Sequence, residues 1–216
     1  MIFHKQKSIF FHVGKAAGTS IEQMILPGTR DPYFSDRKLL YGFDRDLNIF
    51  LQHATCQTTL DLVGREIFDK YFKFTVVRNP YSRLLSAYYY LPDSHEKRYG
   101  SFREFILKLH DIVRSPGLNR GSHFISQMRY THIDGVMVAD YVGKFEDLTA
   151  ATLEITQQLE ISATLPELNK TQVQAYQYQT GGSPYDDEMI SVMQDVYKED
   201  FELFDYDPSP SIRKPS

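Results

Sequence analysis

Short apolar runs alternate along the chain with longer amphipathic stretches, and glycine, proline and aspartate gather between many of them. The apolar runs predict strands near residues 8–13, 48–53, 72–78 and 139–143. The amphipathic stretches predict helices near residues 18–26, 57–70, 80–91, 101–113, 119–129, 146–160, 171–178 and 185–204. Strands that alternate with helices are typical of a parallel sheet with helices on both faces, so we expect an α/β fold with an irregular loop at residues 27–46.

The first predicted strand leads into a short basic loop and then into a helix. Lys15 stands in this loop, and Ala17, Gly18, Thr19 and Ser20 form the helix start. Unpaired backbone N–H groups and the helix dipole make such a point a natural anion site, and a lysine adds a mobile charge. The lysine precedes the glycine, whereas it follows the glycines in a Walker A loop. The alternative is an ordinary strand-turn-helix junction with a solvated lysine.

A second strand-turn-helix segment begins with the β-prone run at residues 72–77, and Asn79-Pro80 ends that run. Arg78 stands at the strand end, and Ser86 lies two helical turns further on. An arginine fork and a serine hydroxyl suit a terminal phosphate. The alternative is an arginine that pairs with a carboxylate of the protein.

Together the two segments resemble the sulfotransferases that use 3′-phosphoadenosine 5′-phosphosulfate (PAPS), in particular soluble bacterial-type members of the carbohydrate branch, which includes the heparan-type 2-O-sulfotransferases. The resemblance implies a P-loop-like fold in which Lys15 and residues 17–20 bind the 5′-phosphosulfate, while Arg78 and Ser86 bind the 3′-phosphate. Further segments that look like family landmarks are residues 140–148, 165–169 and 196–206. The chain departs from the pattern at Gly14, where relatives often carry proline.

The same resemblance implies transfer of a sulfuryl group to a hydroxyl acceptor, a carbohydrate or glycoconjugate, with His53 as the catalytic base. Histidine suits proton transfer near neutral pH, and His53 ends the predicted strand at residues 48–53. His12 and His123 are the next candidates. A structural or substrate-orienting role for His53 stays open.

Three further polar side chains are candidates for the same pocket. The resemblance suggests that the loop with Lys170 closes over the nucleotide, so that Lys170 reaches a phosphate; the alternative is a helix cap with an exposed lysine. Gln127 and Tyr130 follow His123 near the predicted helix at residues 119–129 and are candidates to face the acceptor.

Composition narrows the class of protein. The 216 residues are 42% hydrophobic and 14% aromatic, which fits one compact domain at residues 1–207 with a mobile tail at 208–216. The net charge of −4 argues against a general nucleic-acid binder. The single cysteine, Cys56, excludes an internal disulfide, and together with His53 it is too little for a metal site, so we expect no metal. Without an 18-residue apolar run or a signal peptide, we expect a cytoplasmic protein with no membrane span.

Two other functions stay open. Residues 136–140 imitate the apolar strand and aspartate that help to hold Mg²⁺ in P-loop kinases, although the reversed lysine order and the Arg78–Ser86 segment count against a kinase. A non-catalytic sugar-binding module on the same fold is the second alternative, because fold alone does not determine function.

Overall fold

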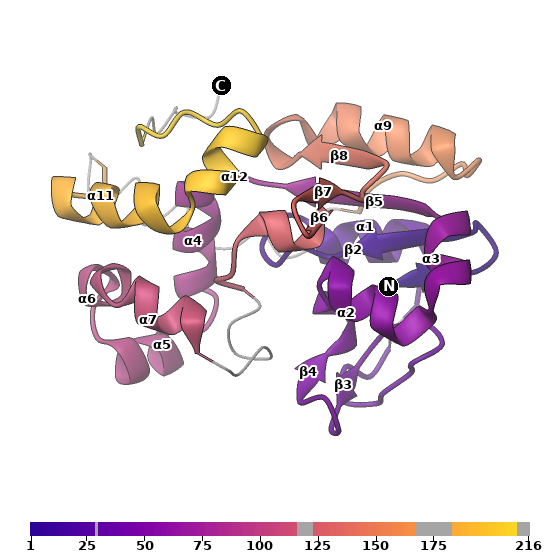
Figure 1. The fold of residues 1–216 in the computed structure, drawn as a ribbon, viewed down its shortest axis with the longest axis horizontal. Coiled ribbons are helices and arrows are strands. Elements are labelled where there is room, and N and C mark those ends of the chain that lie inside the picture. Colours follow the sequence, from indigo (N-terminus) through magenta and orange to yellow (C-terminus); the bar gives the residue numbers. More distant parts are fainter. Residues whose placement is uncertain (29, 116–122, 167–182, 211–216) are drawn as a thin grey trace.

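A four-stranded, mostly parallel sheet forms the centre of this computed structural model, which describes residues 1–28, 30–115, 123–166 and 183–210 (Figure 1). The strands lie in the order β1-β2-β5-β8. Their bounds are Ile2–Phe3, Ser8–Phe11, Phe72–Val77 and Tyr141–Lys144. β2, β5 and β8 are parallel, and β1, which the sequence did not predict, adds an antiparallel edge. The expected α/β class with a mainly parallel sheet is therefore confirmed.

Alternate side chains of the strands enter two cores, one on each face of the sheet. Phe10 and Phe74 stack with their ring centroids 5.1 Å apart, and they pack in one cluster with residues of α1 (Gly18–Ile25) and α9 (Leu148–Gln158). Phe11 points the other way, into a cluster with residues of α2 (Cys56–Val63) and α3 (Arg65–Lys70). Burial of each such aromatic ring contributes about 1.5–3 kcal/mol, so the two cores fix the sheet between its helices.

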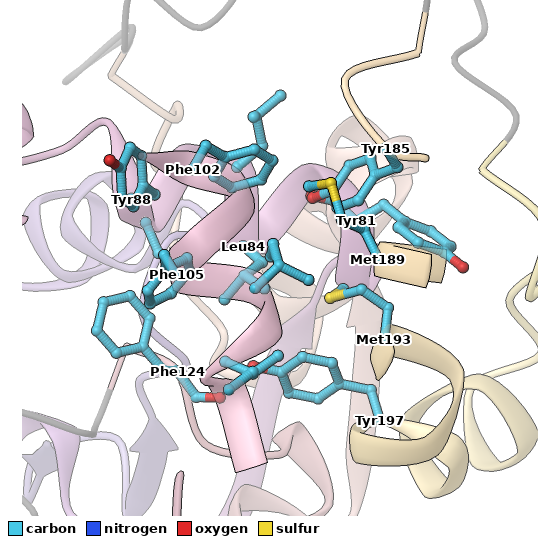
Figure 2. Close-up of a cluster of buried hydrophobic side chains, with 14 of the residues drawn as sticks. Tyr81, Leu84, Tyr88, Phe102, Phe105, Phe124, Tyr185, Met189, Met193 and Tyr197 are labelled. Carbon is cyan, nitrogen blue, oxygen red and sulfur yellow. The ribbon is translucent and has the colours of Figure 1, made fainter. Parts of the chain in front are cut away.

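The remaining helices form a separate part of the molecule beside the sheet (Figure 1). They are α4 (Pro80–Tyr88), α5 (Pro92–Tyr99), α6 (Phe102–Leu107), α7 (Leu109–Arg114), α11 (Asp187–Val196) and α12 (Lys198–Leu203). A third core, rich in aromatic and methionine side chains, holds them together (Figure 2). Beyond α12, the carbonyl of Pro208 accepts hydrogen bonds from the Tyr81 hydroxyl (2.6 Å) and from Gln194 (2.9 Å).

Several predicted helices are shorter than expected. The helix at residues 57–70 is broken at Gly64, whose φ of 78° is left-handed, and the helix at 185–204 is broken at Tyr197. The predicted helix at 101–113 divides at Lys108. In the described part of the predicted helix at 119–129 there is only a turn and the short 3-10 helix η2 (Gln127–Tyr130), because Ser126 has an extended backbone and caps Met128. The predicted helix at 171–178 lies outside the described residues.

The predicted strand at residues 48–53 was wrong. Only Ile49–Phe50 is extended (β4), and it pairs with β3 (Phe43–Asp44) in a separate two-stranded sheet. Leu51–His53 forms the 3-10 helix η1, which places the fully buried Leu51 in the core below the sheet. Within this apolar run, a short hairpin strand is followed by one helical turn. The local pattern alone does not distinguish this arrangement from a single strand.

Residues 136–140 do not form the buried strand and metal-holding aspartate that a P-loop kinase uses. Val136–Met137 (β7) forms an exposed hairpin with β6 (His132–Ile133). Asp140 accepts hydrogen bonds from the backbone N–H of Lys73 (2.7 Å) and from its ammonium (2.9 Å). This contact lies where β5 and β8 begin, whereas ligands of such sheets bind where the strands end. The kinase alternative therefore loses its metal-holding aspartate.

Candidate functional site

The two basic loops meet at the edge where β2 and β5 end. The strands are parallel neighbours, so Lys15 and Arg78, which follow them, lie at the same edge of the sheet. An N–H of the Arg78 guanidinium (Nη1) donates a hydrogen bond of 3.1 Å to the backbone carbonyl of Lys15. The structure thus joins the two segments that the sequence singled out.

The Lys15 loop reaches α1 through a backbone that alanine and lysine rarely adopt. Lys15 has a φ of 68° and Ala17 a φ of 64°, both in the left-handed region. Such a conformation costs roughly 1–2 kcal/mol per residue, so the surrounding structure must hold it in place. Ala17 is the N-cap of α1 and provides no side-chain cap, which leaves N–H groups of the first helical turn open to a ligand.

Gly18 makes room for a buried histidine behind this loop. A Cβ atom at Gly18 would lie only 1.9 Å from the ring of His12, so glycine is required here for close approach. The Nδ1 atom of His12 lies 2.7 Å from a carboxylate oxygen of Glu22, and both residues are buried. Burial acts to raise the pKa of Glu22, but the charge of His12 and the hydrogen bond outweigh it and lower that pKa. The pair therefore ties β2 to the first turns of α1.

Within the described part of the chain, the ammonium of Lys15 has an aromatic partner and no carboxylate partner. Its Nζ atom lies 3.8 Å from the ring centroid of Tyr90, which is 47% exposed. Among the ion pairs of the described residues, none includes Lys15 or Arg78. Burial, together with the positive charge of Arg78, lowers the pKa of Lys15 to about 8. A buried ammonium whose pKa is lowered by a neighbouring cation lies in an environment that favours an anion.

Arg78 is held from several sides. Its Nε atom donates to the hydroxyl of Ser82 at 3.0 Å, and its guanidinium carbon lies 4.2 Å from the ring centroid of Phe145. Burial lowers the pKa of Arg78 to about 10. The serine in contact with the guanidinium is Ser82, while Ser86, which we expect to bind the same phosphate as Arg78, is buried one turn further along α4. Arg78 precedes the N-cap Asn79 and is not part of α4, so no helical spacing in the sequence indicates its contact with Ser82.

His53 lies beside the end of β2 although it is not in a strand. The Nδ1–H of His53 donates to the carbonyl of His12 at 3.1 Å, which leaves Nε2 unprotonated and able to accept a proton. Its ring centroid lies 4.4 Å from that of His12 and 5.2 Å from that of His123. Burial and the neighbouring His12 and His123 hold the pKa of His53 well below its ordinary value. The imidazole is consequently neutral at neutral pH.

A chain of ring contacts connects His53 to Lys15. The ring of His123 contacts His53 and also lies 5.8 Å from that of Tyr90, which in turn covers the Lys15 ammonium. Burial, Lys15 and His12 lower the pKa of His123 to about 3. His123 is one of the two alternative bases that the sequence indicates, whereas no signal in the sequence identifies Tyr90 as a partner of the lysine.

Beside His53 is a depression with a largely apolar wall. The described residues that line it are Ile49, Phe50, His53, Ala54, Thr55, Thr58 and Ile125, and among these His53 is the one titratable side chain. Gln127 and Tyr130, which the sequence placed toward an acceptor, are both fully buried and thus do not face one. Lys170 lies outside the described residues.

The described residues provide neither a metal centre nor a membrane-spanning helix. Within residues 1–28, 30–115, 123–166 and 183–210, no three histidine, cysteine, aspartate or glutamate side chains are grouped so that they would hold a metal ion. The helices in these ranges include none with the length and apolar character to cross a bilayer.

A comparison with known protein families gives one match. A family model described as the sulfotransferase family matches residues 1–207. Neither a search of curated proteins nor a search of solved structures gave a significant match. The family match includes the Lys15 loop, the Arg78 loop and all described helices and strands. The chain therefore belongs to the sulfotransferase family.

Proposed function

We propose that this protein transfers a sulfuryl group from PAPS to a hydroxyl group of a carbohydrate or glycoconjugate, and that residues 1–207 form the single catalytic domain. The observation that carries the proposal is the contact between the two loops, in which the Arg78 guanidinium donates to the Lys15 carbonyl. Neither Lys15 nor Arg78 has an ion-pair partner among the described residues. A nucleotide that carries anionic groups at its 5′ and 3′ positions matches two such cations.

The residues fit a donor of this class. Lys15 and the uncapped backbone N–H groups at Gly18, Thr19 and Ser20 suit the 5′-phosphosulfate, because they combine a positive charge with the open start of α1. Arg78 uses two of its five N–H groups on Ser82 and on the Lys15 carbonyl, so others remain for the 3′-phosphate. We assign Ser86 to the same phosphate, and Lys170 remains a candidate for the nucleotide.

In the reaction, the acceptor oxygen forms a bond to sulfur while the bond between sulfur and the phosphate oxygen breaks. Negative charge then develops on the departing phosphate, where Lys15 and the N–H groups of the loop stabilise it. Preorganised donors of this kind contribute about 3–4 kcal/mol each. Nε2 of His53 accepts the proton of the acceptor hydroxyl, since Nδ1 is committed to the His12 carbonyl. The depression beside His53 is the expected approach of the acceptor.

Calorimetry with two nucleotides tests the donor assignment. Adenosine 3′,5′-bisphosphate should bind at least tenfold more tightly than adenosine 5′-monophosphate, because charged hydrogen bonds contribute about 1.5–3 kcal/mol each and about 1.4 kcal/mol corresponds to a factor of ten. Arg78→Met should abolish this preference. Equal affinities of the unmodified protein for the two nucleotides would overturn the assignment. Sulfate transfer from labelled PAPS to a panel of sugars should continue in EDTA, which a Mg²⁺-dependent kinase reaction would not.

A further inference from the structure

A buried amide and a buried carboxylate lie behind Arg78. Gln127 belongs to η2 and Asp200 to α12, and both residues are fully buried. They are 73 residues apart in sequence. Burial of a polar group is unfavourable unless its hydrogen bonds are made. The hydrogen-bond partners of these two side chains therefore indicate which parts of the chain they fix.

Gln127 holds both backbone groups of Arg78. Its side-chain oxygen accepts from the N–H of Arg78 at 2.8 Å, and its side-chain nitrogen donates to the carbonyl of Arg78 at 2.9 Å. One rigid amide thus fixes the N–H and the C=O of a single residue. The direction in which the Arg78 side chain leaves the backbone is set by this pair of bonds.

Asp200 holds the turn that presents Gln127. One carboxylate oxygen accepts from the Ser126 hydroxyl (2.6 Å) and from the N–H of Met128 (3.1 Å). The other accepts from the N–H of Gln127 (3.0 Å) and from its side-chain nitrogen (3.3 Å). The side-chain amide of Gln127 is therefore fixed in rotation as well as in position, with its nitrogen shared between Asp200 and the Arg78 carbonyl.

We propose that Gln127 and Asp200 are positioning residues that aim the Arg78 guanidinium and thereby set the preference of the donor site for a 3′-phosphate. This inference rests on the proposed function, since it assigns a purpose to the orientation of Arg78. Ser82 and Phe145 contact the guanidinium itself, whereas Gln127, held by Asp200, fixes the backbone from which the guanidinium extends. Bidentate contacts of a guanidinium depend on direction, so a small rotation of the backbone weakens them.

The test is the ratio of two dissociation constants, that of adenosine 5′-monophosphate over that of adenosine 3′,5′-bisphosphate. Gln127→Met keeps the length of the side chain and removes its hydrogen bonds. It should lower the ratio at least threefold, with the affinity for the monophosphate within twofold of the unmodified protein. Asp200→Asn keeps an oxygen acceptor and the size, and it should lower the ratio by a smaller factor. If Gln127→Met does not fold, Asp200→Asn decides the question.

Tyr88→Phe is the matched control, because it removes a hydrogen bond from a largely buried hydroxyl to the carbonyl of Gly100 in the helical part. It should leave the ratio unchanged even if the melting temperature falls. A folded Gln127→Met protein, or Asp200→Asn in its place, with the unmodified ratio and only a lower melting temperature would overturn the inference. A ratio near one in the unmodified protein would instead overturn the donor assignment itself, and with it the role proposed for Gln127 and Asp200.

Discussion

The two basic loops have the same local plan, strand then turn then helix, yet the protein stabilises them by different means. The Arg78 loop is held by hydrogen bonds: Gln127 clamps its backbone, and the Asn79 side chain caps α4 by accepting from the N–H groups of Tyr81 (3.0 Å) and Ser82 (3.4 Å). The Lys15 loop has left-handed backbone at Lys15 and Ala17 and no side-chain cap.

The difference decides which helix can bind an anion with its backbone. At the start of α4, protein atoms already occupy the N–H groups, so Arg78 must act through its side chain. At the start of α1, the N-cap side chain accepts no hydrogen bond, and within the described residues the N–H groups stay open to a ligand. A loop whose donors are open and preorganised stabilises charge that appears during a reaction, whereas a loop that offers one fixed guanidinium binds charge that is present throughout. We therefore expect changes at the two loops to separate turnover from binding.

The largest effect is expected at His53, next to the Lys15 loop. His53→Ala should lower kcat by about 10²–10⁴, because the acceptor hydroxyl loses its base, while nucleotide affinity stays nearly constant. Steady-state kinetics and calorimetry on the same samples measure both quantities. His110→Ala removes a partly exposed histidine beside Asp195 and serves as the control. A folded His53→Ala protein with a near-normal kcat would reject the assignment and point to His12 or His123.

Lys15 comes next. Lys15→Ala should lower kcat by roughly 10²–10³ while the fold survives, because the ammonium acts mainly on charge that develops in the transition state. Arg78→Met, by contrast, should weaken donor binding more than it lowers kcat. Lys97, an exposed lysine of α5, provides the control variant Lys97→Ala. If Lys15→Ala raised only the KM for the donor, the two loops would have the same role and the comparison between them would fail.

The positions of both loops could be predicted from the sequence because each depends on neighbouring residues. An apolar run ended by Lys15 and Gly18, or by Asn79 and Pro80, specifies strand, turn and helix locally. The contact of Arg78 with Ser82 was not predicted, since it depends on how α4 is oriented against the sheet.

Contacts between residues that are distant in the sequence could not be predicted from local patterns. Nothing local connects Gln127 to Asp200, 73 residues later, or explains why a buried glutamine is needed there. His53 was predicted at the correct edge of the sheet for the wrong reason: it is in η1, not in a strand, and it reaches the edge through its bond to the His12 carbonyl. A short apolar run states that a segment is buried but not in which conformation.

Donor binding and turnover should depend on pH in different ways. Burial and Arg78 lower the pKa of Lys15 to about 8, and a bound anion favours the protonated ammonium. Donor affinity should therefore be nearly constant between about pH 7 and 8, above the second ionisation of a phosphate monoester near pH 6, and should fall above pH 8 by at most about tenfold per pH unit. Since the pKa of His53 lies well below its ordinary value, kcat should show no rise between about pH 6 and 7, where an unperturbed histidine titrates.

Binding titrations from pH 6 to 9 and the corresponding rate profile measure these two limits. In Lys15→Ala the decline above pH 8 should disappear, and in Arg78→Met it should move to higher pH, because the positive neighbour that lowers the lysine pKa is gone. A decline that persisted unchanged in Lys15→Ala would assign it to another group.

The smallest effect concerns the backbone strain of the Lys15 loop. Ala17→Gly should raise the free energy of unfolding by about 0.5–1 kcal/mol, because relief of the left-handed backbone exceeds the entropy that a glycine adds to the unfolded chain. For a protein of this size, each kcal/mol corresponds to a change in Tm of roughly 2–4 °C. Ala16→Gly is the matched control: Ala16 is buried and has no positive φ, so its replacement should destabilise the protein. Scanning calorimetry compares the two variants directly. If both lowered Tm alike, the left-handed backbone at Ala17 would not be strained.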